Sequence, residues 1–421
     1  MKNYLIVGIE RLVLIFFKFM SLFLMMKYLS ISEMGIIAML TLYIGFSTIL
    51  LDSGFSGAFL RKGNITQKDY DFLFTNSLSI SVIIYILSIC SASYVKEKYS
   101  LDNFFIYLTI IMTSLFFRNK NIVYNLFYLQ GGKFKEISRV SNLTQVSGFI
   151  LLWFFLYLGF KIYAFVFQVL VETIMINLLY RLKFNFKNSL NFNYKEYYEI
   201  IKLSYSTLIS SLIRVGYDYF LVFFILSNFG IKNLGLYSQA NRFNNLFMTA
   251  FMGVVDKVTF VNYVKIDNKK LYNKFNLIFS LTLTITFLVL NIAYYFLDFF
   301  ISNFLELQWS ELVNILPFIF IISFLTVADL NVRTLIKAKL SAKTILFNEI
   351  YKKIFSIIFL LICILYYQDF YIILRFLVFC AVFNFIISFL SVLKYLKFDI
   401  IFILTSTVVI LSSLIGLVYI C

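Results

Sequence analysis

Apolar runs of about twenty residues recur along the whole chain and are separated by short polar segments. A helix needs about 20 apolar residues to cross the roughly 30 Å hydrocarbon core of a bilayer. We count thirteen such runs, at 5–29, 35–60, 72–95, 103–126, 140–159, 162–182, 203–228, 234–256, 275–297, 312–333, 344–366, 371–393 and 400–420. The short alternating segments of a transmembrane β-barrel are not seen. The pattern predicts an all-α, polytopic membrane protein with 12–14 transmembrane helices.

Basic residues are distributed unevenly between the two sides of the predicted spans. With the N-terminus inside, the cytoplasmic segments hold 25 Lys and Arg residues, among them Arg118, and the outer segments hold 5. Because cytoplasmic loops carry an excess of basic residues, a cytoplasmic N-terminus is predicted. The same rule accounts for the net charge of +16 without a nucleic-acid partner. The outer loops are too short for a folded domain, so we expect the function to reside within the membrane.

The composition limits the chemistry that the chain can perform. The 421 residues are 61% hydrophobic and include no histidine, which excludes a histidine general base and histidine metal ligands. The four cysteines lie in or at the end of apolar runs, without the spacing of metal ligands or of a redox pair. We therefore expect no catalytic residue, no metal site and no cofactor.

The two halves of the chain align without a gap at an offset of 200 residues. Lys2 aligns with Lys202, and the segment 34–36 (MGI) aligns with 234–236 (LGL). We interpret spans 1–6 and 7–12 as parallel six-helix repeats related by an axis along the membrane normal, an arrangement known in transporters. The predicted organisation is an N-terminal lobe, a cytoplasmic linker, a C-terminal lobe and an additional helix, at 1–183, 184–202, 203–393 and 394–421.

Charged residues within the spans are the candidate site, because a charge at the bilayer centre costs at least about 2.5–3.5 kcal/mol. Arg214 and Asp218 lie one turn apart near the middle of the seventh span and share a helix face. At the repeat offset, this face corresponds to the stripe formed by Arg11 and Lys18 in the first span. We expect the two faces to line a central, water-filled cavity. The alternative for Arg11 is a place near the inner interface, with its guanidinium extending to water.

Further charged residues fall within the predicted spans. Arg242 follows a polar stretch at the start of the eighth span and would line the outer half of the same cavity. Glu172 is alone near the middle of the sixth span and is a candidate for ion coupling. Asp329 precedes Arg333 by four residues and could pair with it, whereas Asp52 precedes small residues that fit close helix packing. The cations outnumber the acids in the predicted cavity, which favours an anionic ligand such as a phosphate or an acidic sugar.

Two segments resemble a known family. They are Asp52–Ala58 (DSGFSGA), after the second span, and Leu234–Ala240 (LGLYSQA), which begins the eighth span. With the two six-helix lobes and a basic turn after the fourth span, they make the chain similar to Wzx-type polysaccharide flippases. These belong to the multidrug/oligosaccharidyl-lipid/polysaccharide exporter superfamily. Members of that family have twelve or fourteen spans, so the thirteenth span departs from the pattern.

The resemblance implies a function within the bacterial inner membrane. Such proteins move undecaprenyl-diphosphate-linked oligosaccharides, for example O-antigen units of lipopolysaccharide, to the outer leaflet by alternating access. The resemblance implies that Arg11, Lys18, Arg214 and Arg242 contact the substrate. It implies that Asp52, Asp218 and Asp329 act in coupling or gating, in addition to Glu172. The implied partners are the lipid-linked oligosaccharide, membrane lipids, protons or sodium ions, and a polysaccharide polymerase with its chain-length regulator.

Two other classes of function stay open. An ion-coupled drug or cation antiporter of the same superfamily should have an acidic cavity, whereas the predicted one is basic. A membrane polysaccharide polymerase or transferase would need other features, since polymerases usually carry a large outer loop. Asp69-Tyr70-Asp71 matches the DxD pattern of metal-dependent transferases, but we interpret it as an exposed helix start.

Overall fold

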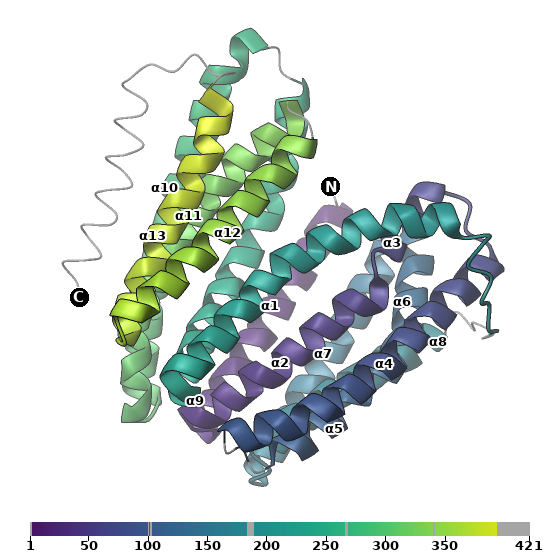
Figure 1. The fold of residues 1–421 in the computed structure, drawn as a ribbon, viewed down its shortest axis with the longest axis horizontal. Coiled ribbons are helices and arrows are strands. Elements are labelled where there is room, and N and C mark those ends of the chain that lie inside the picture. The colour runs from purple at the N-terminus through teal and green to yellow at the C-terminus, as the bar shows by residue number, and fades with distance from the viewer. Residues whose placement is uncertain are drawn as a thin grey trace. The chain divides into compact units, whose positions relative to one another are not determined.

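The computed structural model describes residues 2–99, 101, 103–182, 189–265, 268–339 and 342–393. Within these ranges the chain is built of helices joined by short connections, and no strand is present (Figure 1). Eight helical stretches of this described part are long and apolar enough to cross a membrane. The chain forms two compact units, Met1–Val222 and Phe223–Cys421. The all-α, polytopic fold predicted from hydropathy is therefore confirmed.

The first unit is a bundle in which α1 packs along α7, and α8 packs against α5, α6 and α7. Long apolar stretches form these helices because their backbone groups must be hydrogen-bonded within the membrane. Its helices are α1 (Lys2–Tyr28), α2 (Ile31–Asp52), α3 (Phe55–Lys62), α4 (Gln67–Tyr99), α5 (Phe104–Met112), α6 (Ser114–Gln130), α7 (Phe134–Tyr157), α8 (Ile162–Arg181) and the first part of α9 (Tyr198–Lys265).

The second unit contains the rest of α9 and four further long helices. In Figure 1, α10, α11, α12 and α13 run side by side, and α11 contacts each of the other three. The elements after α9 are α10 (Asn268–Phe304), η1 (Leu307–Trp309), α11 (Ser310–Lys339), α12 (Ala342–Tyr366) and α13 (Phe370–Leu393). Buried Trp309 closes the short connection between α10 and α11.

Twelve of the thirteen predicted spans coincide with helices of the structure, and the thirteenth, 400–420, lies outside the described residues. Spans 7 and 8 follow each other in α9, interrupted only at Gly230, whose backbone (φ 78°, ψ 178°) is not helical. A glycine tolerates this conformation without a steric penalty. The predicted outer turn between these spans is therefore reduced to a kink.

The segment Asp52–Ala58 differs from its prediction. We expected its small residues to allow close helix packing, within one span at 35–60. Instead, Ser53 (φ 46°) and Gly54 (φ 76°) adopt left-handed conformations that end α2 and begin α3. A side chain at Gly57 would meet open space. Since left-handed residues end a helix, Ser53 and Gly54 form a turn between α2 and α3.

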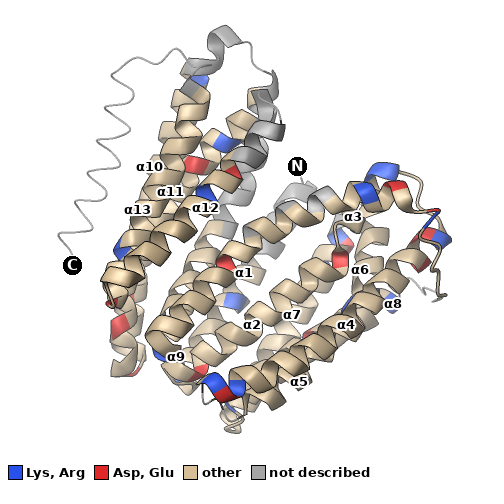
Figure 2. Cartoon of the chain, viewed as in Figure 1, with Lys and Arg blue, Asp and Glu red and all other residues tan. Residues whose placement is uncertain are grey.

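The segment before α9 packs on the first unit at the end where α4 begins. Tyr197 stacks on Phe72 with ring centroids 4.0 Å apart and planes inclined by 14°. The backbone N–H of Asn191 donates to Thr75 Oγ1 at 2.8 Å. Figure 2 shows blue and red segments gathered near this end of the unit, with few along the helix middles. Burial, with the Asp69 charge nearby, raises the pKa of the Tyr197 phenol.

Candidate functional site

A cavity of about 350 Å³ lies within the first unit, between α2, α6, α7 and α8. The residues that line the cavity lie in one half of the unit. In this half α2, α6 and α8 end and α7 begins. Glu172 lies nine residues before the end of α8, which at 1.5 Å per residue places it about 14 Å from that end, near the middle of a bilayer. The polar side chains on the wall are Thr48, Arg118, Asn121, Asn125, Ser141, Glu172 and Thr173.

Glu172 fills space that a side chain on α7 would otherwise occupy. A Cβ atom added at Gly148 would lie 2.1 Å from Glu172 Oε1 and 2.6 Å from its Cγ. Gln168, one turn earlier on α8, donates from Nε2 to Oε1 at 2.9 Å. The charges of Lys18 on α1 and Arg118 on α6 both act on the Glu172 carboxylate. A carboxylate predicted to be alone in its span is therefore bonded to Gln168 and shares a cavity wall with Arg118.

Arg118 is the residue that sequence reasoning missed, because it was assigned to a cytoplasmic loop. In the structure it lies on α6, and its Nη1 donates to Thr48 Oγ1 of α2 at 3.1 Å. Its Nε is buried and has no hydrogen-bond partner among the described residues, and the same holds for Asn121 Oδ1. The signal was present in the sequence, since Arg118 stands eight residues inside the end of the predicted span 103–126.

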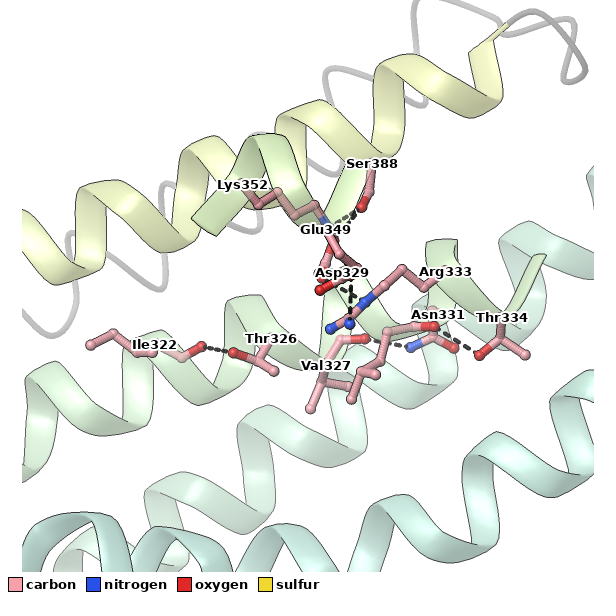
Figure 3. A network of polar contacts seen from close by, with 11 residues as sticks. Ile322, Thr326, Val327, Asp329, Asn331, Arg333, Thr334, Glu349, Lys352 and Ser388 are labelled. Carbon is pink, nitrogen blue, oxygen red and sulfur yellow. Dashed lines mark hydrogen bonds and ion pairs between the residues drawn. The ribbon is translucent and has the colours of Figure 1, made fainter. Parts of the chain in front are cut away.

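A network of four charged side chains lies within the second unit (Figure 3). Asp329 on α11 is 5% exposed and Lys352 on α12 is 2% exposed, and their Oδ1 and Nζ atoms are 2.7 Å apart. Arg333 pairs with Asp329 at 2.9 Å and with Glu349 at 2.9 Å. Ser388 of α13 hydrogen-bonds to both Asp329 and Lys352. The predicted Asp329–Arg333 pair is confirmed, and it is half of a network whose charges cancel.

The structure places the other predicted site residues separately. Lys18 on α1 and Asp218 on α9 are exposed, and Arg242 on α9 is half-buried. Asp52 accepts a bond from the Ser56 backbone N–H at 3.3 Å and another from its hydroxyl, and so caps α3. The side chains of Arg11 and Arg214 lie outside the described residues. The predicted central cavity is not tested by the described residues and stays a prediction, as do the roles of these residues.

The DxD motif is not exposed, contrary to our interpretation. Asp69 is 1% exposed and Asp71 is 6% exposed. Asp69 accepts from Lys62 Nζ at 2.7 Å and from the Thr66 backbone N–H at 2.8 Å. Asp71 accepts from Gln67 at 3.1 Å and from the Ser189 hydroxyl. Both carboxylates are therefore occupied in holding the start of α4 against its neighbours, where buried acids need partners.

Two helical units, each with charged groups buried among apolar helices, define a polytopic membrane protein. The fold is similar to that of two solved proteins. "Lipid II flippase MurJ, inward closed conformation" has a TM-score of 0.70 at 18% identity, over 100% of this chain and 92% of that chain. An inward-facing MATE-family multidrug transporter of the MOP superfamily has a TM-score of 0.67 at 14% identity, over 92% of this chain and 98% of that chain.

The sequence itself matches the model of one protein family, described as polysaccharide biosynthesis protein, over residues 24–314. This match covers more than half of the chain, and the chain belongs to that family. No curated protein matches the sequence. The resemblance drawn from Asp52–Ala58 and Leu234–Ala240 is thus confirmed in family and fold.

Proposed function

We propose that this protein is a flippase that moves undecaprenyl-diphosphate-linked oligosaccharides from the inner to the outer leaflet of the bacterial inner membrane. The observation that carries the proposal is the match to a polysaccharide biosynthesis family on a fold that a lipid II flippase shares. In this role the protein acts as a transporter and performs no covalent chemistry. Protons or sodium ions, a polymerase and a chain-length regulator are its proposed partners.

The passenger would be held by cations on the first helices of the two units. Lys18 is exposed on α1 and is the first of these proposed contacts. Arg11, Arg214 and Arg242 are the other proposed contacts. Guanidinium groups bind phosphate oxygens through paired hydrogen bonds, so a diphosphate suits such a set. Alternating access between the two units would then carry the headgroup across while the prenyl chain stays in lipid.

A drug or cation antiporter is the second candidate, favoured by the similarity to a multidrug transporter. A cationic drug would need unpaired carboxylates along its path. In the described part, Asp329 is paired with Arg333 and Lys352, and Glu172 lines a cavity together with Arg118. A DxD-dependent transferase finds less support, because Asp69 already accepts four hydrogen bonds from Lys62 and Thr66.

The experiment is genetic rescue of a bacterial strain that lacks its own polysaccharide flippase, read as surface polysaccharide. We expect rescue by the wild type when the strain makes a matching sugar unit, and loss of rescue by Lys18→Gln and by Arg214→Ala with normal membrane insertion. Lys98→Gln is the matched control, since Lys98 is an exposed cation near the end of α4. Full activity of Lys18→Gln and Arg214→Ala would refute their assignment. No rescue in any strain, with export of a cationic dye, would favour the antiporter.

A further inference from the structure

The cavity of the first unit is lined by one face from each of several helices. On α6 the lining residues are Arg118, Asn121, Ile122 and Asn125, whose spacing of three and four residues places them on one helix face. The lining positions at the start of α7 and in the last part of α8 have the same spacing. The volume of about 350 Å³ falls within the roughly 300–1,000 Å³ of small-molecule pockets. The cavity therefore has room for a small organic ligand.

The polar side chains on this wall combine hydrogen-bond donors with acceptors. Arg118 donates from Nη1 to Thr48 Oγ1 at 3.1 Å, while its buried Nε has no partner among the described residues. Asn121 donates from Nδ2 to the Thr173 carbonyl at 3.1 Å, and its buried Oδ1 has no partner in the same part of the chain. Since buried polar atoms are normally hydrogen-bonded, this donor and this acceptor require a ligand or water as partner.

Among the described residues, the wall carries one cation and one acid, Arg118 and Glu172. Each hydrogen-bonds to a neutral side chain, since Glu172 Oε1 accepts from the Gln168 amide at 2.9 Å and Arg118 donates to a hydroxyl. A diphosphate would meet the carboxylate, and a cationic drug would meet the guanidinium, so a like charge opposes either ligand. The wall favours a neutral ligand with several hydroxyl or amide groups.

A neutral sugar ring has this chemistry. Its hydroxyls both donate and accept hydrogen bonds, and the C–H face of the ring is apolar. Val140 on α7, with Ile176 and Tyr180 on α8, supplies apolar surface on the same wall. With the predicted cytoplasmic N-terminus, the half of the unit that holds the cavity faces the cytoplasm. A ligand from the cytoplasmic side therefore has the shorter path to it.

We propose that this pocket binds a neutral sugar, with Arg118, Asn121 and Asn125 as the contacts that select it. That the sugar belongs to the lipid-linked passenger rests on the proposed flippase function, whereas the chemistry of the pocket does not. The cations proposed to hold the diphosphate lie on α1 and α9, outside this wall. Sugar and diphosphate are thus recognised by different residues and can be tested separately.

The first test is saturation-transfer NMR of the purified full chain, titrated with glucose, galactose and N-acetylglucosamine. We expect at least one sugar to bind the wild type. Arg118→Gln should weaken binding about tenfold or more, because it removes hydrogen bonds from a charged group. Asn125→Ala should weaken it about two- to tenfold, and since Asn125 is exposed on the wall, its loss should leave folding intact.

Lys120→Gln is the matched control for these variants. Lys120 is a cation on the same helix, but it lies about 200° around α6 from Arg118 and does not line the cavity. This variant should bind sugar as the wild type does. The proposal is overturned if no sugar of the panel binds, or if Arg118→Gln and Asn125→Ala bind as tightly as Lys120→Gln.

The second test separates the sugar pocket from the flippase function. A short prenyl diphosphate without sugar should bind the wild type and Arg118→Gln equally, whereas both pocket variants should reduce rescue of surface polysaccharide in a flippase-deficient strain. Weaker binding of the prenyl diphosphate by Arg118→Gln, or full rescue by both variants, would overturn the proposal and leave the flippase function in place. Sugar binding without rescue in any strain would refute the flippase function and support a pocket for a free sugar.

Discussion

The buried network of the second unit predicts unequal effects for the two members of one ion pair. In Asp329→Asn, Lys352 keeps the Ser388 hydroxyl, but its nearest acid is Glu349 at 3.9 Å. In Lys352→Met, Asp329 still pairs with Arg333 at 2.9 Å. The first change leaves a 2% exposed ammonium without its partner, and the second leaves a carboxylate that is still paired.

The magnitudes follow from these contacts. Removing one partner of a buried pair and stranding the other charge costs about 3–5 kcal/mol, which is the value expected for Asp329→Asn. Losing one hydrogen bond to a charge that stays paired costs about 1.5–3 kcal/mol, which is expected for Lys352→Met. The double variant retains Arg333 and Glu349 at 2.9 Å as a neutral pair. It should therefore be more stable than Asp329→Asn alone, by at least about 1 kcal/mol.

Reversible unfolding of the purified protein in mixed micelles, with all three variants, measures these differences. The exposed pair Lys232–Glu311, also 2.7 Å apart, supplies the control. Lys232→Met should cost no more than about 1 kcal/mol, because solvent screens that pair. Additive losses for Asp329→Asn and Lys352→Met, or a larger loss for Lys352→Met, would refute the reasoning.

Three further predictions concern single positions of the first unit. Gly54→Ala should lower the unfolding free energy by about 1 kcal/mol, because the backbone at Gly54 is left-handed, with φ 76°. Gly57→Ala should raise it slightly, because alanine favours the helix and its Cβ meets open space within α3. Unfolding curves of the two variants, measured side by side, test both. Gly45→Ala should displace Tyr219, whose hydroxyl would lie 2.7 Å from the new Cβ, and a melting temperature below that of the wild type would report the displacement. The pKa of Tyr197 is raised in the folded state, so the phenol stabilises the fold fully below about pH 10, and this stabilisation is lost as the pH rises through the folded pKa. Tyr197→Phe removes the titrating group. The unfolding free energy of this variant should therefore fall less at alkaline pH than that of the wild type.

Hydropathy was sufficient to predict the positions of the helices. Each long apolar run within the described residues is helical because the membrane leaves the backbone no other way to satisfy its hydrogen bonds. The exact starts and ends of the helices were predicted less well. Ser30 and Glu33 form a capping box that begins α2 at Ile31, four residues before the predicted start. The turn at Ser53 and Gly54 was hidden within an apolar run, because hydropathy does not report left-handed backbone.

Contacts between helices were harder to predict than contacts within one helix. Asp329 and Arg333 are four residues apart, so the helical repeat predicts their pair. Lys352 reaches the same carboxylate from α12, and no spacing in the sequence relates the two. Asp69 was predicted to be exposed because its partner Lys62 precedes it on another helix. Periodicity gives the face of each helix, but the pairing of faces depends on packing.

Asp329 and Glu172, two of the acids predicted to act in coupling or gating, have different surroundings. Asp329 has two cations and a hydroxyl within bonding distance in a network of zero net charge, so adding a proton there would break contacts that stabilise the fold. Glu172 has one amide donor, a neighbouring cavity and an excess of positive charge around it. A proton on Oε2 would leave the hydrogen bond from Gln168 to Oε1 in place. Coupling by Glu172 stays a prediction, whereas the contacts of Asp329 hold α11, α12 and α13 together.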